Sequence, residues 1–299
     1  MVPLDYYIVD VFSETVLAGN PLAVVINNAD LTTEEMQSIA VEFNLSETTF
    51  VQRRALAIER QEGIRVRIFT TQEELDFAGH PTLGTASVLR LFAPECEQDS
   101  TITLAENVGP IPVCFSSADH DLFAEMTQRD PEFGVTLDPR EVAHLCGLQF
   151  DDLDPAAPPQ IVSTGTAFAI VLLRSHEALG RLKVRQDESS AWLRERGARW
   201  FYVLAPRPDQ VKCMPQFFAR MQFNGGEDPA TGSAAGCAVS YLVHHRIAHS
   251  ATRFLIRQGI EIGRPSTIFV AAARLDSKIT NVRVAGSTVL VAKGQLFLP

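Results

Sequence analysis

His80-Pro81-Thr82-Leu83-Gly84-Thr85-Ala86 recurs in the second half of the chain as Asp228-Pro229-Ala230-Thr231-Gly232-Ser233-Ala234, so the pattern [HD]-P-x-x-G-[ST]-A describes both stretches. The offset between the two copies is 148 residues. A second pair, residues 19–25 and 165–171, shares G-x-x-x-A-[VI]-V at an offset of 146 residues. Because both offsets are close to half of the 299 residues, we predict two homologous halves with one domain in each.

Each copy of the motif follows an apolar segment and opens a stretch of small residues that is typical of a buried helix, over residues 81–92 and 229–245. Proline in the first turn, directly after His80 or Asp228, is typical of a helix start. The first turn of a helix has N–H groups without intrahelical partners and carries the positive end of the helix dipole. Two such ends facing each other would bind an anion such as a carboxylate.

Short apolar or alternating segments indicate that strands dominate the rest of the chain. A buried helix among many strands indicates a sheet curled around that helix. A helix over 33–44 leading into a strand also resembles a helix over 188–197 leading into a strand. The expected strands cover residues 6–12, 22–26, 48–52, 64–69, 101–105, 111–115, 160–163, 167–173, 200–204, 216–222, 253–258, 267–272, 281–284 and 288–292.

The composition excludes several classes of protein. The net charge is −10 and the Lys and Arg residues are scattered, so we expect no nucleic-acid partner. No apolar run reaches the roughly 18 residues of a membrane span, and the N-terminus lacks a charged and apolar leader, so we expect a cytoplasmic protein. Five cysteines without C-x-x-C spacing indicate reduced, mostly buried thiols, and we expect no metal site.

The motif residues His80 and Asp228 are candidates for acid–base chemistry. The ordinary pKa of histidine is close to neutrality, and a helix N-terminus would keep the ring of His80 neutral while it stabilises Asp228 as an anion. The competing interpretation is that both residues are helix N-caps, a role that aspartate performs well and histidine does not.

Glu47 is the third candidate because it stands at the entrance of an apolar strand, with no basic residue nearby in the sequence. Desolvation there would raise the pKa of the carboxyl group and let it carry a proton near neutral pH. The competing interpretation is a solvated glutamate at a strand edge. For Cys237, one helical turn after Ser233, a small core residue is favoured over an active-site thiol.

Together, five segments resemble the PhzF phenazine-biosynthesis family of isomerases from about Asp5 to the C-terminus. The segments are Gly19-Asn20-Pro21, Asn44-Leu45-Ser46-Glu47-Thr48, Phe77-Ala78-Gly79-His80-Pro81-Thr82-Leu83-Gly84, Gly226-Glu227-Asp228-Pro229-Ala230-Thr231-Gly232-Ser233-Ala234, and Gln258-Gly259 with Gly263-Arg264-Pro265-Ser266. The resemblance implies an α+β, diaminopimelate-epimerase-like fold with two similar, pseudo-twofold-related domains. In each domain a mainly antiparallel sheet wraps a central helix, and the active site lies between the domains.

The resemblance also implies residue roles. Glu47 matches the glutamate that moves a proton between ring carbons of trans-2,3-dihydro-3-hydroxyanthranilate without a cofactor. His80, Asp228 and Ser233 match its supporting catalytic residues. Three further positions, Ser46, Gly79 and Gly232, match substrate-binding positions, the two glycines through their backbone. The substrate implied is a small carboxylate, and the expected assembly is a homodimer.

The expected domains are 1–125 with a C-terminal strand over 286–299, carrying Glu47 and His80, and 126–285, carrying Asp228 and Ser233. Two alternatives stay open at this stage: an amino-acid epimerase or racemase, and a non-catalytic protein that binds small carboxylates. A racemase of the two-cysteine type is disfavoured because neither motif contains cysteine. The sequence identifies neither the substrate and its pathway nor the stereochemical outcome.

Overall fold

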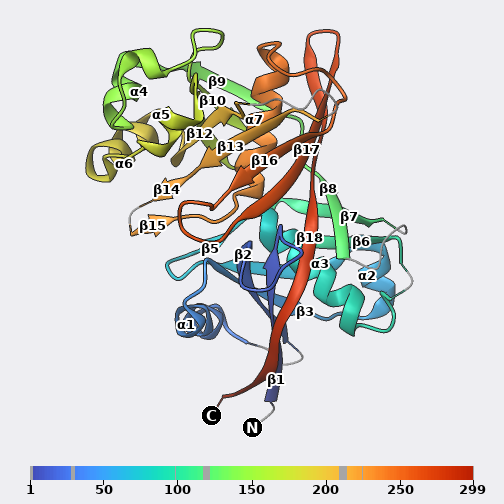
Figure 1. Ribbon diagram of the computed structural model, residues 1–299. Coiled ribbons are helices and arrows are strands. Elements are labelled where there is room, and N and C mark those ends of the chain that lie inside the picture. Colours follow the sequence, from blue (N-terminus) through green and yellow to red (C-terminus); the bar gives the residue numbers. More distant parts are fainter. Residues whose placement is uncertain are drawn as a thin grey trace. The chain divides into compact units, whose positions relative to one another are not determined.

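The computed structural model describes residues 3–27, 31–97, 99–116, 122–208, 214–223 and 225–298 (Figure 1). Its contacts divide the chain into two compact units. Unit 1 is Met1–Thr127 with Ala285–Pro299, and unit 2 is Gln128–Val284. These bounds lie within two residues of the expected domain bounds. No helix among the described residues is long and apolar enough to cross a membrane. Cys213 lies outside the described residues.

Unit 1 combines one connected set of strands with a long buried helix. Its sheet begins at the C-terminal part of β18, which pairs antiparallel with β1. The elements are β1 (Pro3–Val11), β2 (Asn20–Asn27), α1 (Thr33–Phe43), β3 (Glu47–Gln52), α2 (Leu56–Glu62), β4 (Ile64–Phe69), β5 (Glu74–Leu75), α3 (Gly79–Phe92), β6 (Thr101–Glu106), β7 (Gly109–Phe115), β8 (Leu122–Thr127) and β18 (Lys278–Phe297), which belongs to unit 1 from Ala285 onward.

Unit 2 contains the same kinds of element, with additional short helices. These elements are β9 (Glu132–Thr136), α4 (Pro139–Leu145), the 3₁₀ turn η1 (Phe150–Asp152), β10 (Gln160–Ser163), β11 (Ala167–Leu172), α5 (His176–Gly180), α6 (Gln186–Glu195), β12 (Trp200–Pro206), β13 (Gln216–Arg220), β14 (Gln222–Phe223), β15 (Gly226–Glu227), α7 (Gly232–His244), β16 (Phe254–Gln258) and β17 (Ser266–Leu275).

The two units repeat one strand topology. In unit 1 the pairs β2–β3 and β4–β6 are parallel, whereas β3–β4 and β6–β7 are antiparallel. In unit 2 the pairs β11–β12 and β13–β16 are parallel, whereas β12–β13 and β16–β17 are antiparallel. Along the chain, α3 falls between β4 and β6, and α7 falls between β13 and β16. The duplication predicted from the repeated motif is therefore present in the topology.

A buried helix lies against the strands of each unit, as the small-residue stretches predict. In unit 1, α3 packs against β1, β2, β3, β6, β7 and β8 (Figure 1, teal). In unit 2, α7 packs against β10, β11, β12 and β17 and is buried through Val243. A Cβ atom at Gly84 would come within 2.6 Å of the Leu22 side chain, so only glycine lets α3 approach the sheet this closely.

The predicted helix starts were wrong. Helix α3 begins at Gly79, with Ala78 as its N-cap, so His80 and Pro81 are already inside the first turn. Helix α7 begins at Gly232, with Thr231 as its N-cap, and leaves Asp228 outside the helix. Neither His80 nor Asp228 is therefore an N-cap.

Some strand predictions also differ from the structure. The segments 281–284 and 288–292 form one continuous strand, β18, which runs through Gly286. A Cβ atom at Gly286 would lie 2.4 Å from the Phe12 ring, so this glycine lets the strand pass close to that ring. The segment 216–222 is interrupted at Met221, and the following strand pairs with β15 instead. Strands β8 and β9 were not predicted.

Candidate active site

Glu47 and His80 come together in unit 1. Glu47 is the first residue of β3 and His80 is the second residue of α3. The Oε2 atom of Glu47 lies 3.2 Å from Nε2 of His80, a close polar approach whose geometry falls short of a hydrogen bond. The side chain of Glu47 is 16% exposed and that of His80 is 4% exposed. Glu47 is therefore not the solvated strand-edge residue of the competing interpretation.

Asn20 determines which nitrogen of His80 carries the proton. Asn20 begins β2, is fully buried, and places its amide Nδ2 3.2 Å from Nδ1 of His80. Because the Nδ2 group of an amide is only a donor, Nδ1 of the ring accepts this hydrogen bond. The proton of the neutral ring is then on Nε2, the nitrogen that faces Glu47. In the sequence, Asn20 belongs to the Gly19-Asn20-Pro21 segment, and nothing in that segment by itself indicates a contact with His80.

Burial keeps His80 neutral. Desolvation lowers the pKa of His80 from 6.5 to about 3, so the ring carries no charge at neutral pH. The neutral ring was predicted from the helix dipole, whereas the cause in the structure is burial. The neutral ring brings no positive charge to the Glu47 carboxylate, so His80 does not form an ion pair with it.

The two remaining unit 1 candidates flank this pair. Gly79 is the first residue of α3, so its N–H has no intrahelical acceptor. Ser46 is half-buried and directly precedes β3. Both therefore adjoin one of the two central residues along the chain.

In unit 2, Asp228 is buried in a short non-helical segment before α7. Its Oδ2 atom accepts a 2.6 Å hydrogen bond from the hydroxyl group of Thr231, and its N–H donates to Met221 O at 2.9 Å. Asp228 as a whole residue is 9% exposed. Asp228 is therefore held by a neutral hydroxyl donor.

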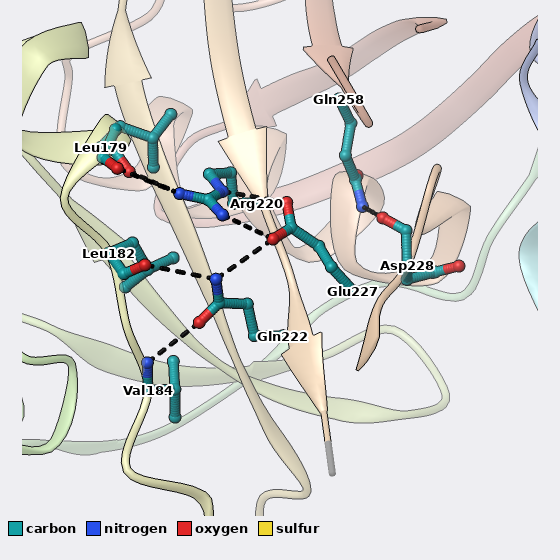
Figure 2. Close-up of polar contacts among 9 residues, drawn as sticks. Leu179, Leu182, Val184, Arg220, Gln222, Glu227, Asp228 and Gln258 are labelled. Carbon is teal, nitrogen blue, oxygen red and sulfur yellow. Dashed lines mark hydrogen bonds and ion pairs between the residues drawn. The ribbon is translucent and has the colours of Figure 1, made fainter. Parts of the chain in front are cut away.

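Gln258 explains why α7 starts after this segment. This fully buried residue, the last of β16, donates from Nε2 to Asp228 O at 2.8 Å (Figure 2). It also donates from Nε2 to Thr231 Oγ1 at 2.9 Å. Its Oε1 accepts from Thr231 N at 3.1 Å and from Tyr202 OH at 3.0 Å. In a longer helix, Asp228 O would accept from the N–H of Gly232, and the Gln258 amide replaces that bond.

Glu227 fixes the other side of the same segment, as Figure 2 shows. Arg220 donates to both carboxylate oxygens of Glu227, at 2.9 and 2.6 Å, and also to Leu179 O. Gln222 donates to Glu227 Oε2 at 3.1 Å and to Leu182 O. The hydrogen bonds with Glu227 raise the pKa of Arg220, and this buried ion pair holds the chain directly before Asp228.

Gly232 and Ser233 occupy the first turn of α7. They are its first two residues, and the first intrahelical backbone bond closes at Ala235. The preceding N–H groups are therefore available to an anion. Gln128 anchors this turn by donating to Gly232 O at 3.0 Å, while its Oε1 accepts from Thr164 at 2.7 Å.

Cys237 behaves as a core residue. It is fully buried, and desolvation raises the pKa of its thiol to about 11, so the reactive thiolate is scarce. The part of the chain that the structure describes contains no group of three or more His, Cys, Asp or Glu side chains able to hold a metal ion.

The fold and the site define a duplicated α+β protein with a carboxylate beside a buried neutral histidine in one unit and an oriented aspartate beside a helix N-terminus in the other. The model of the phenazine biosynthesis-like protein family, PhzC-PhzF, matches residues 9–294. The chain belongs to this family of isomerases.

Curated relatives match almost the full chain. An uncharacterized isomerase of Mesorhizobium japonicum is 34% identical, with 98% of this chain and 99% of the relative covered. Trans-2,3-dihydro-3-hydroxyanthranilate isomerase of Pseudomonas aeruginosa is 33% identical, with the same coverage of both chains.

Solved structures confirm the predicted fold class. The PhzF-family phenazine biosynthesis protein of Bacillus anthracis matches with a TM-score of 0.85 and 26% identity, over all of both chains. A probable proline racemase of Agrobacterium radiobacter matches with a TM-score of 0.63 and 11% identity, over 99% of this chain and 93% of that one. The second likeness concerns the fold alone, which is of the diaminopimelate-epimerase-like type.

Proposed function

We propose that this isomerase moves a proton on a small amino- or hydroxy-carboxylate without a cofactor, with Glu47 as the proton carrier. The observation that supports this most directly is the 3.2 Å approach of Glu47 Oε2 to Nε2 of a buried, neutral His80. A carboxylate beside a neutral donor can take up a proton and return it.

The reaction is a shift of one hydrogen and one double bond. Glu47 takes the proton from an activated C–H group, and the electron pair of that bond moves toward the neighbouring double bond. The protonated Glu47 then gives a proton to a carbon at the far end of the double bond. Exchange of the Glu47 proton with the solvent between the two steps would bring deuterium into the product. The number of atoms and electrons is unchanged, and no oxidant or reductant is needed.

The other candidate residues would bind and orient the substrate. We propose that Asp228 holds an amino group, because it is a buried carboxylate oriented by Thr231. Ser233 and the N–H groups at the start of α7 would hold a carboxylate, since a helix N-terminus favours an anion. Gly79 would add a backbone N–H and Ser46 a hydroxyl group, and His80 would donate from Nε2.

The substrate class is tested in deuterated water. The protein is incubated with trans-2,3-dihydro-3-hydroxyanthranilate, which the name of a 33% identical relative suggests, and with a panel of small amino acids. We expect isomerisation with deuterium uptake, followed by NMR. Glu47→Gln should lower the rate by about 10²–10⁴-fold while ligand binding persists.

The matched control is Glu42→Gln, which makes the same change at an exposed residue of α1 and should leave the rate unchanged. Equal rates for Glu47→Gln and the wild type would reject Glu47 as the proton carrier. Inversion at a single carbon would indicate an epimerase, and ligand binding without exchange would indicate a binding protein.

We further propose that the protein is a cytoplasmic homodimer. The described cysteines, Cys96, Cys114, Cys146 and Cys237, are free thiols, which suits a reducing compartment. Light scattering should give twice the chain mass of 32.9 kDa, and a monomer mass would reject the dimer.

A further inference from the structure

Glu106 is a buried carboxyl group that the proposed mechanism does not use. It is the last residue of β6 and is 5% exposed. Its Oε1 atom lies 2.7 Å from the hydroxyl oxygen of Thr82, and the same hydroxyl lies 2.7 Å from Ala78 O. Ala78 is the N-cap residue of α3, two positions before His80. Glu106 is therefore connected through one hydroxyl group to the turn that carries His80.

The hydrogen count at Thr82 distinguishes the two protonation states of Glu106. A threonine hydroxyl has one proton to donate, and the carbonyl oxygen of Ala78 can only accept. Beside an ionised Glu106, the hydroxyl would face two acceptors, and one of the 2.7 Å contacts would have no proton. A protonated Glu106 donates to Thr82, which donates to Ala78 O, so both contacts become hydrogen bonds.

The surroundings of Glu106 also favour the neutral acid. Its Oε2 atom has no hydrogen-bond partner among the described residues. Arg65 of β4 is the charged group that acts on Glu106, but its guanidinium donates to Ala105 O and Asn107 Oδ1 instead. Desolvation raises the pKa of Glu106 to about 8, even though Thr82 and Arg65 lower it.

The duplicated fold provides an independent comparison. Strand β16 of unit 2 has the place in the topology that β6 has in unit 1, and it ends at Gln258. The Gln258 amide donates at 2.9 Å to the hydroxyl of Thr231, which aligns in the repeated motif with Leu83, the residue after Thr82. A neutral donor therefore supports the threonine of unit 2 from the same place in the topology.

We propose that Glu106 is a positioning residue that, as a neutral carboxylic acid, holds Thr82 and the first turn of α3 and so keeps His80 beside Glu47. The kinetic consequence rests on the proposed function, whereas the protonation state of Glu106 does not. Ionisation of Glu106 would turn the Thr82 hydroxyl away from Ala78 O and loosen the turn that carries His80.

The first experiment measures protonation without activity. Carboxyl-labelled glutamate is incorporated into the full chain, and its ¹³C NMR titration is compared between the wild type and Glu106→Gln. One resonance should titrate near pH 8 and be absent from the variant. A Glu106 resonance that titrates near the ordinary value of 4.5 would overturn the proposal.

Unfolding in urea gives a second readout with a definite sign. Because the folded pKa is raised above 4.5, the folded protein holds its proton longer than the unfolded chain as the pH rises. The wild type should therefore lose stability relative to Glu106→Gln as the pH rises from about 5 to about 8. The difference between the two urea midpoints, variant minus wild type, should increase over this range and then level off. Glu42→Gln should show no such change, and parallel curves for all three proteins would contradict a neutral Glu106.

Kinetics test the positioning role. Glu106→Ala should lower kcat by about tenfold or more with a smaller change in KM, because it misplaces His80. Glu106→Gln, whose amide can donate to Thr82, should have a kcat close to that of the wild type. The activity of the wild type should fall above about pH 8, and the activity of Glu106→Gln should not. Thr82→Val should resemble Glu106→Ala, and Thr82→Ser should resemble the wild type. Full activity in Thr82→Val and Glu106→Ala would reject the positioning role of Glu106. Total inactivity of the wild type would reject only the proposed function, because the NMR titration and the urea unfolding do not depend on activity.

Discussion

At the scale of single residues, the chemistry of unit 1 depends on the proton of His80. The Asn20 amide faces Nδ1 and Glu47 faces Nε2, so the neutral ring has one donor and one acceptor, each opposite a suitable group. Burial removes the imidazolium as a competitor, because it lowers the pKa of His80 to about 3. The sequence showed Glu47 and His80 as candidates, but only the folded chain shows that Asn20 selects the tautomer.

Asn20→Asp tests that selection with an almost isosteric change. An aspartate oxygen accepts where the amide donates, so it should draw the ring proton to Nδ1 and leave Nε2 without one. We expect kcat to fall by about 10²-fold. Nitrogen NMR of the labelled histidine should report the exchanged tautomer, and an unchanged spectrum would show that Asn20 does not select it.

His80→Gln should change how stability depends on pH. The folded pKa of about 3 is below the ordinary 6.5, so the unfolded chain takes up a proton first as the pH falls. The resulting stability is complete above about pH 6.5 and is lost toward pH 3, by at most about 1.4 kcal/mol per pH unit. Urea unfolding between pH 4 and 7 should show this slope in the wild type and not in the variant. The exposed His144→Gln is the control and should keep the slope.

At the scale of elements, the repeated motif leads to two different helix starts. Helix α3 includes His80 in its first turn, whereas Asp228 remains in a non-helical segment held by Gln258 and by Glu227. Helix-start rules are local and treat both copies alike, which explains why they placed a helix start directly after Asp228. The decisive partner, Gln258, is 30 residues away in the sequence.

Gln258→Leu should loosen the Asp228 segment. The change leaves Asp228 O, Thr231 N and Tyr202 OH without their buried partner, and unsatisfied buried groups are costly. We expect a loss of about 2–4 kcal/mol in the free energy of unfolding. Tyr202→Phe removes only one of these bonds and should cost about 1 kcal/mol. Urea unfolding followed by fluorescence checks both values, and equal losses would contradict a central role for Gln258.

At the scale of the whole molecule, the two units differ in which segments of the chain form them. Unit 2 is one continuous segment, whereas unit 1 needs both ends of the chain, because β18 pairs with β1 from Pro3↔Phe297 to Val11↔Thr288. Leu296 and Leu298 also pack against the core cluster of unit 1 that contains Met36. Unit 1 can therefore complete its sheet only after the C-terminus is present.

Truncation after Ser287 should affect the units unequally. It removes every residue of β18 that pairs with β1, so the β1 amide protons on the β18 side should lose their protection from hydrogen exchange, whereas those on the β2 side keep their partner strand. Both tryptophans, Trp192 and Trp200, belong to unit 2, and their fluorescence should remain native. Unchanged protection of the β1 amides on the β18 side in the truncated chain, or unfolded tryptophan emission, would contradict this division of the fold.

The sequence by itself determined the duplication, the family, the buried helices and the residue types of the candidate site, because repeats, hydrophobic periodicity and motif residues are local properties of the chain. Only the tertiary structure decided the tautomer and charge of His80, the late start of α7, and the link from Glu106 to Thr82. Each of these depends on burial or on a hydrogen bond between segments far apart in sequence. The desolvation that lowers the pKa of His80 and raises that of Glu106 arises only when strands and helix pack around them.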